Sequence, residues 1–224
     1  MKPEFIIIGD SHTKALKDGF DALGIPTELV QHSGDTYHRN MIRMNHHGAF
    51  FSKKKYIMKQ FSATAEKLGM DSLADGTIPV VASIGYHLGR LIPPLWWNDH
   101  VLYNDDAKMK PGQMVMSQGF LETYIEQSRV GQFRLIKRMS MRTDLTIITP
   151  PPLDDRHAMK VATKYINDRV KSLNVNVYDA RQDFCQDGRV FPEELIDADG
   201  VHGSKRYGQM LVENLLEQGF IKRR

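Results

Sequence analysis

The stretch FIIIGDSHTKAL, residues 5–16, decides the fold class of this chain. Four consecutive apolar residues, Phe5–Ile8, are typical of a strand that is buried on both faces. Turn residues end this strand, and a helical pattern begins at once at Thr13. A buried strand that passes directly into a helix indicates a parallel α/β sheet. Ser11 lies at the turn between them, either as a nucleophile or as a residue that caps the helix.

Four more apolar runs, each bounded by turn residues, predict further strands at 27–31, 79–84, 145–148 and 175–178. Helical periodicity between the strands predicts helices at 13–23, about 51–68, 121–139, 159–173 and 204–218. Ser204 is the expected N-cap of the last helix, and Gly219 its end. This alternation predicts a flavodoxin-like three-layer α/β/α sandwich with a mainly parallel five-stranded sheet.

A chain of 224 residues fits one domain, and we expect residues 1–224 to form it. Two segments, at about 35–76 and 88–116, are longer than ordinary connections and are interpreted as insertions. The single cysteine, Cys185, cannot form an internal disulfide, which favours a reducing compartment. With no signal-peptide pattern and no apolar run of membrane-spanning length, the sequence predicts a cytoplasmic protein.

The charge balance is modest, because 30 basic and 27 acidic residues give a net charge of +3. The basic run Lys53–Lys55 is interpreted as solvated surface, or as a group that attracts an anionic substrate together with Arg39 and Arg43. No nucleic-acid-binding motif is present, so we expect no nucleic-acid partner. The sequence gives no indication of the oligomeric state.

A serine hydroxyl becomes a good nucleophile only when a neighbouring base accepts its proton and a third group orients that base. The loop before the last predicted helix supplies both groups, since Asp199 and His202 are three residues apart in it. Asp199 is expected to hold Nδ1 of His202, which leaves Nε2 free to face Ser11. Asp197 competes for the carboxylate role, but its spacing from the histidine is less suitable.

The carboxyl ends of parallel strands meet at one edge of a sheet, so residues that follow the predicted strands share a rim. The amides of Ser11 and Gly34 and the side chain of His87 are candidates for an oxyanion hole at this rim. Asp10, Gly85 and Tyr86 are candidates for substrate contact, with a structural hydrogen bond as the alternative role of Asp10.

Together these motifs resemble those of the SGNH (GDSL-type) hydrolases. Gly9-Asp10-Ser11 is similar to the nucleophile motif of that family, Ser33-Gly34-Asp35 to its glycine motif, and Asp199-Gly200-Val201-His202 to its Asp-x-x-His motif. The motifs stand in the family's order and run over nearly the whole chain. The resemblance implies the flavodoxin-like fold, Ser11 as nucleophile, His202 as base and Asp199 as its partner.

The sequence departs from the family pattern at His87. The family has an asparagine of the oxyanion hole at this place, in a Gly-x-Asn-Asp motif, whereas this chain has Gly85-Tyr86-His87-Leu88. A neutral imidazole donates one hydrogen bond and can take the asparagine's place. The departure leaves open whether the protein is a variant carboxylic ester hydrolase, acting on a small-molecule or glycan ester, or a ligand-binding module without catalysis. An O-acyltransferase is a third alternative, because the same residues serve hydrolysis and acyl transfer.

No metal or cofactor is expected. The histidines outside the proposed triad show no metal-binding spacing and no accompanying cysteine cluster. No glycine-rich phosphate loop follows the first strand, which argues against a flavin- or nucleotide-binding protein.

Overall fold

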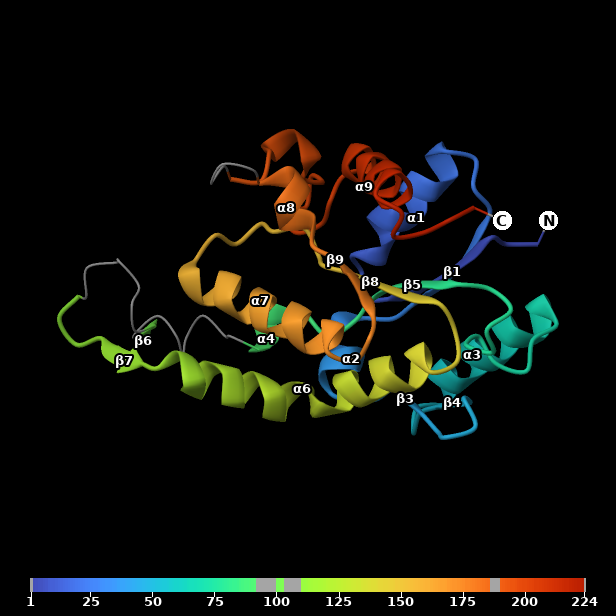
Figure 1. Cartoon of the computed structure of the whole chain (residues 1–224), viewed down its shortest axis with the longest axis horizontal. Helices are drawn as coiled ribbons and strands as arrows, with labels where there is room; N and C mark the ends of the chain where they lie inside the picture. The colour runs from blue at the N-terminus through green and yellow to red at the C-terminus, as the bar shows by residue number, and fades with distance from the viewer. Residues whose placement is uncertain (1, 92–99, 103–109, 186–189, 224) are drawn as a thin grey trace.

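The computed structural model describes residues 2–91, 100–102, 110–185 and 190–223 (Figure 1). Its central sheet is formed by β1 (Phe5–Gly9), β2 (Thr27–Gln31), β5 (Val80–Ser83), β8 (Leu145–Ile148) and β9 (Asn176–Tyr178). The strand order is β2-β1-β5-β8-β9, and every pairing is parallel. The predicted five-stranded parallel sheet is therefore confirmed.

Helices cover both faces of the sheet, as Figure 1 shows. One face carries α1 (Thr13–Ala22), α8 (Ala180–Phe184) and α9 (Lys205–Glu217). The other carries α2 (Gly34–His38), α3 (Lys55–Leu68), α6 (Gln118–Ser140) and α7 (His157–Lys171). Two shorter elements are α4 (Leu88–Leu91) and the 3-10 helix η2 (Glu193–Leu195). The three-layer fold expected from the sequence and from its resemblance to the SGNH hydrolases is confirmed.

The first strand shows why both layers are needed. Successive side chains of a strand point to opposite faces of the sheet. Ile6 and Ile8 accordingly pack in the core beneath α3, α6 and α7, whereas Phe5 and Ile7 pack in the core beneath α1 and α9. All four side chains are buried, so a continuous apolar run is what this position requires.

Helices α1 and α9 approach each other closely at two glycines. A Cβ atom on Gly19 would collide with the backbone of Gly208, and a Cβ on Gly208 would collide with the carbonyl group of Ala15. Only residues without side chains allow the two backbones to come this close. This contact fixes the position of α9 on the sheet.

The insertions contain structure that the sequence patterns did not define. In the first, β3 (Arg43–Met44) pairs antiparallel with β4 (Phe50–Phe51), so α3 begins at Lys55 and not near residue 51 as predicted. In the second, β6 (His100–Leu102) pairs with β7 (Met114–Met116), and residues 92–99 and 103–109 lie outside the described part. Among the described helices, none has both the length and the apolar character needed to cross a membrane.

Replacing Gly208 by alanine tests the contact between α1 and α9. The new methyl group must push the helices apart, so we expect Gly208→Ala to lower the free energy of unfolding by about 2 kcal/mol. Urea denaturation followed by circular dichroism measures this change. Gly119→Ala is the matched control, because its Cβ would meet open space. Equal stability of the two variants would show that the glycine contact is unimportant.

Candidate active site

Ser11 lies just beyond the carboxyl end of β1, two residues before α1 begins. The N-cap of α1 is His12, which makes no side-chain capping bond, so Ser11 does not cap this helix. The turn is held instead by the backbone carbonyl of Asp10, which accepts hydrogen bonds from the Thr13 amide at 3.1 Å and the Thr13 hydroxyl at 2.6 Å. The Ser11 hydroxyl is therefore available for other contacts.

The loop from Asp197 to Ser204 brings the second part of the site to Ser11. Its ends are joined by a bridge between Ile196 and Gly203, and the Asp197 amide donates to the carbonyl of His202 at 2.8 Å. Ser204 caps α9, as predicted, by accepting a hydrogen bond from the Tyr207 amide at 3.3 Å. These bonds close the loop on itself, and the N-cap at Ser204 fixes the end of the loop to the start of α9.

Within this loop, Asp199 organises the histidine. Its Oδ1 accepts hydrogen bonds from the amides of Val201 at 2.9 Å and His202 at 3.0 Å. Its Oδ2 lies 2.6 Å from His202 Nδ1. The hydrogen bond from His202, followed by those two amides, holds the pKa of the Asp199 carboxyl far below its usual range. Asp199 is therefore an anion at neutral pH.

The other nitrogen of the histidine faces the serine. His202 Nε2 lies 2.7 Å from Ser11 Oγ, so Asp199, His202 and Ser11 form a continuous chain of hydrogen bonds. The two residues that meet here are 191 positions apart in the sequence. Asp197, the competing carboxylate, is turned toward Lys14 instead, at 3.9 Å.

The ring of His12 packs beside the ring of His202, with ring centroids 5.0 Å apart. Burial, and secondarily the proximity of His202, lower the pKa of His12 to about 4. His12 is therefore neutral at neutral pH and does not compete with His202 for a proton. Its Nδ1 is buried without a hydrogen-bond partner in the described part of the chain.

Asp10 is buried below the serine rather than exposed to a substrate. Its Oδ1 accepts a hydrogen bond from the His12 amide at 3.1 Å, which agrees with the structural role considered for it. Burial raises the pKa of Asp10 to about 6, and the hydrogen bond from the His12 amide and the nearby His87 and His202 only partly offset this effect. The turn at Ser11 thus contains a carboxylate that is costly to keep ionised.

Gly34 and His87 are in direct contact. A Cβ atom on Gly34 would overlap the imidazole of His87, so only glycine leaves room for this ring. Gly34 is the first residue of α2, whose N-cap Ser33 accepts a hydrogen bond from the Thr36 amide. His87 itself has a positive φ of 36°, a strained conformation for a residue other than glycine.

A buried arginine holds the backbone that carries His87. Arg129 on α6 is 1% exposed, and its guanidinium donates to the carbonyl oxygens of Gly85 and Tyr86 at 2.8 Å each and of His87 at 3.3 Å. It also lies 3.2 Å from Nδ1 of His38. Burial lowers the pKa of Arg129 to about 10, so the side chain remains a cation at neutral pH. One cation thus fixes three successive carbonyl groups next to the site.

Tyr86 does not face the site. Its side chain is 1% exposed, and its hydroxyl donates to Asn167 Oδ1 at 2.6 Å in the core below α7. Asn167 in turn donates to Asp179 Oδ2 at 2.9 Å. The expected substrate contact of Tyr86 is therefore replaced by a structural hydrogen bond, and Gly85 is buried with its carbonyl bound to Arg129.

A cleft of about 380 Å³ opens above the serine and the histidine. Ser11, His12, His87 and His202 line one part of it, whereas Asp10, Gly34, Gly85 and Tyr86 do not. Apolar residues also line the cleft, namely 150–153, Met159 and Val201. Arg156 and Arg181 also line the cleft, but they are paired with Asp154 and Asp155.

The remaining histidines do not gather into a metal site. Among the described residues, no group of three or more His, Cys, Asp or Glu side chains is placed to hold a metal ion. His32 is buried, with its ring 5.5 Å from that of Phe61.

The role of Arg129 was not predicted from the sequence, although the spacing of residues in α6 indicates that Arg129 is buried. The buried residues of α6 recur mostly at spacings of three or four, and they are Leu121, Ile125, Arg129, Gln132, Phe133, Leu135, Ile136 and Met139. A charged residue at an apolar position of a helix is expected only where it has buried partners. The pattern therefore predicts that Arg129 has hydrogen-bond partners in the protein interior.

No protein-family model matches the sequence, and no curated protein matches it. Solved structures are similar over most of their length but at low identity. The psychrotrophic esterase EstA from Pseudoalteromonas sp. has 15% identity and a TM-score of 0.46, with 97% of this chain and 96% of the esterase covered. A GDSL-like lipase from Bacteroides thetaiotaomicron has 14% identity and a TM-score of 0.44, with 96% and 86% covered. At such scores the fold assignment rests on the strand order and the pairing described above.

The buried carboxyl of Asp10 predicts a stability that depends on pH. Because its pKa is raised from 3.8 to about 6, the folded protein retains a proton that the unfolded chain releases between these values. Its contribution to stability therefore falls as the pH rises through this window, by about 3 kcal/mol in total. Asp10→Asn keeps the acceptor for the His12 amide and removes this cost, so it should stabilise the protein at pH 8 and much less at pH 4.

Thermal and urea denaturation of Asp10→Asn and the wild type across pH 4–8 measure this difference. The titration of His12 contributes to both proteins and largely cancels in the comparison. A stability difference that does not change with pH would contradict the raised pKa of Asp10.

Replacing Arg129 tests whether its hydrogen bonds to the backbone around His87 stabilise the protein. Arg129→Met preserves the length of the side chain but leaves three buried carbonyl groups without their donor, so we expect a loss of about 3 kcal/mol in unfolding free energy. Arg134→Met, at an exposed position of the same helix, is the control and should change the stability by less than about 0.5 kcal/mol. Similar losses in both variants would show that the buried contacts are not specific.

Proposed function

We propose that this chain is a serine hydrolase of the SGNH (GDSL) type that cleaves a carboxylic ester through an acyl-enzyme. The observation that carries the proposal is the chain of hydrogen bonds from Asp199 to His202 at 2.6 Å and from His202 to Ser11 at 2.7 Å. It lies in a cleft with room for a small ester or for the end of an acylated glycan.

In the first half of the reaction, Ser11 Oγ attacks the carbonyl carbon of the ester while its proton moves to His202 Nε2. The tetrahedral intermediate then collapses, and the bond between the carbonyl carbon and the alcohol oxygen breaks. The leaving alcohol takes the proton from His202. The acyl group remains on Ser11 as a new ester.

In the second half, a water molecule attacks the acyl-enzyme and gives a proton to His202 Nε2. The bond between the acyl carbon and Ser11 Oγ breaks, and His202 returns the proton to the serine. The products are a carboxylic acid and an alcohol. If a sugar hydroxyl replaced water in this step, the same residues would perform acyl transfer.

Asp199 suits the role of orienting group. As an anion it holds the proton on His202 Nδ1, which keeps the lone pair of Nε2 directed at the serine. It also stabilises the imidazolium that forms when Ser11 loses its proton. The neutral ring of His12 packs beside His202 without placing a second positive charge there.

The amides of Ser11 and Gly34 and the side chain of His87 are the proposed oxyanion hole. The close contact of Gly34 with the His87 ring brings two of the three candidates together, and His87 lines the cleft beside Ser11. Donors of this kind typically contribute about 3 kcal/mol each to transition-state stabilisation. Arg129 then acts as a positioning residue, because it fixes the backbone of His87.

Substitutions in the proposed triad test this function with 4-nitrophenyl acetate as substrate. We expect Ser11→Ala and His202→Ala each to lower kcat by more than about 1,000-fold, and the double variant to be no worse than either. Asp199→Asn should lower kcat by about 100-fold or more, since the histidine loses its preferred tautomer. Asp197→Asn is the matched control and should remain within about twofold of the wild type.

Esterase activity that survives Ser11→Ala would contradict the proposal. Absence of activity in the wild type on a panel of short-chain esters and acylated sugars would favour a binding module. The products distinguish the two catalytic alternatives, because hydrolysis releases free acid and acyl transfer forms a new ester on an added glycan.

A further inference from the structure

The charges of this chain are unevenly distributed. Segments 36–65 and 127–143 contain eleven Lys and Arg residues and no Asp or Glu. Because the whole chain has 30 basic and 27 acidic residues, the rest of it carries a net charge of −8. A net charge of +3 for the whole protein therefore conceals a strongly basic part.

These two segments lie side by side in the fold. Arg138 on α6 donates to the carbonyl of Met44 in β3, and Arg142 donates to the carbonyl of His46 at 2.6 Å. Both segments are on the side of the sheet away from α1 and α9 (Figure 1). The two acid-free segments thus form one surface, which we call the basic face and which comprises Arg39, Arg43, Lys53, Lys54, Arg134 and Arg138.

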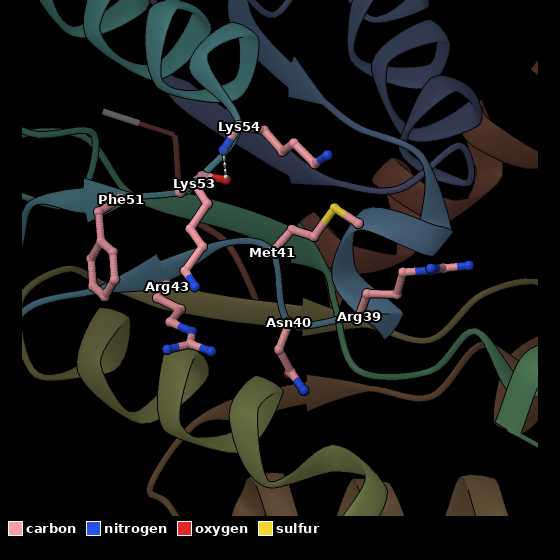
Figure 2. A pocket seen from close by; sticks show the side chains of 8 residues that line it. Arg39, Asn40, Met41, Arg43, Phe51, Lys53 and Lys54 are labelled. Atoms are coloured by element: carbon pink, nitrogen blue, oxygen red, sulfur yellow. Dashed lines mark hydrogen bonds between the residues drawn. The ribbon is translucent and has the colours of Figure 1, made fainter.

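The basic face contains two adjoining hollows of about 240 and 340 Å³. They share Asn40, Arg43 and Phe51, and no acidic residue lines either of them. Figure 2 shows that Arg43 and Asn40 extend toward α6, whereas Arg39 and Lys54 extend in another direction. The cationic groups therefore spread over a surface and do not converge on one point.

Most of these cations have no acidic partner among the residues that the structure describes. Arg39 is paired with Asp35 at 2.9 Å. No ion pair among the described residues involves Arg43, Lys53, Lys54 or Arg134. Their charge is available to an external anion.

Exposed apolar side chains lie between these cations. Phe51 is 41% exposed and Val130 is 37% exposed, and both line the hollow that contains Arg43, Arg134 and Arg138. Met141, at 75% exposed, lies three residues after Arg138 and lines the next hollow along α6 together with Arg138. That hollow also contains the acidic residue Asp75. Cations interspersed with exposed apolar groups are typical of a surface that meets lipid headgroups.

We propose that the basic face docks on the surface of an anionic phospholipid bilayer. The dispersed cations match an extended anionic surface better than a single phosphate group. The apolar side chains then reach the boundary between headgroups and acyl chains, where they leave water. A nucleic acid would use the cations and the Phe51 ring but not the exposed Val130 and Met141.

Flotation with lipid vesicles tests this inference. We expect the wild-type protein to bind vesicles containing 30% phosphatidylglycerol at about 50 mM salt and not to bind vesicles of phosphatidylcholine alone. Arg43→Glu with Lys53→Glu should weaken binding by about tenfold or more. Both positions are exposed, so the variant should fold, which circular dichroism checks.

Lys2→Glu with Lys222→Glu is the matched control, because it makes the same charge change at exposed positions near the chain ends. Retention of binding by this control within about twofold supports a specific face. Equal losses in both double variants would overturn the proposal, as would absence of wild-type binding to the anionic vesicles. Tighter binding to a single-stranded oligonucleotide than to vesicles would also overturn it. Ser11→Ala should float like the wild type, so the result does not depend on the proposed catalysis.

Discussion

The close packing of α1 on α9 is the constraint on which the site depends. Ser11 stands two residues before α1, and His202 stands three residues before α9. The glycines Gly19 and Gly208 let the backbones of these helices touch, which fixes the two helix starts relative to each other. A shift of 1 Å between them would break the 2.7 Å contact of His202 with Ser11, since hydrogen bonds weaken steeply beyond about 3.2 Å.

The charges around this contact are set by neighbouring protein groups. Asp199 is held as an anion by three donors, whereas His12 is kept neutral by burial. Arg129 is a cation buried among backbone carbonyls, and it fixes the segment that ends in the strained His87. Buried charges of this kind are retained when every partner is satisfied, and they make the local geometry rigid. The backbone of His87, one of the oxyanion-hole candidates, therefore has little freedom to move.

Much of the fold could be predicted from the sequence because the strands are continuous apolar runs with clear turn residues at their ends. The position of Ser11 at the rim followed from the same logic, since carboxyl ends of parallel strands share a rim. Asp199 and His202 were predicted instead from their spacing in the loop before the last helix. The role of Tyr86 could not be predicted, because its neighbours in sequence do not reveal that its hydroxyl reaches Asn167 on a distant helix. The start of α3 was misplaced because the two-residue strand Phe50–Phe51 is too short to show an alternating pattern.

An activated Ser11 nucleophile can be identified by covalent labelling. The protein is treated with a fluorophosphonate, which reacts with activated serines, and the modified residue is located by mass spectrometry of tryptic peptides. We expect a single adduct on Ser11, in the peptide that ends at Lys14, and its loss when His202 is replaced by alanine. An adduct on another residue, or none in a folded protein, would contradict it.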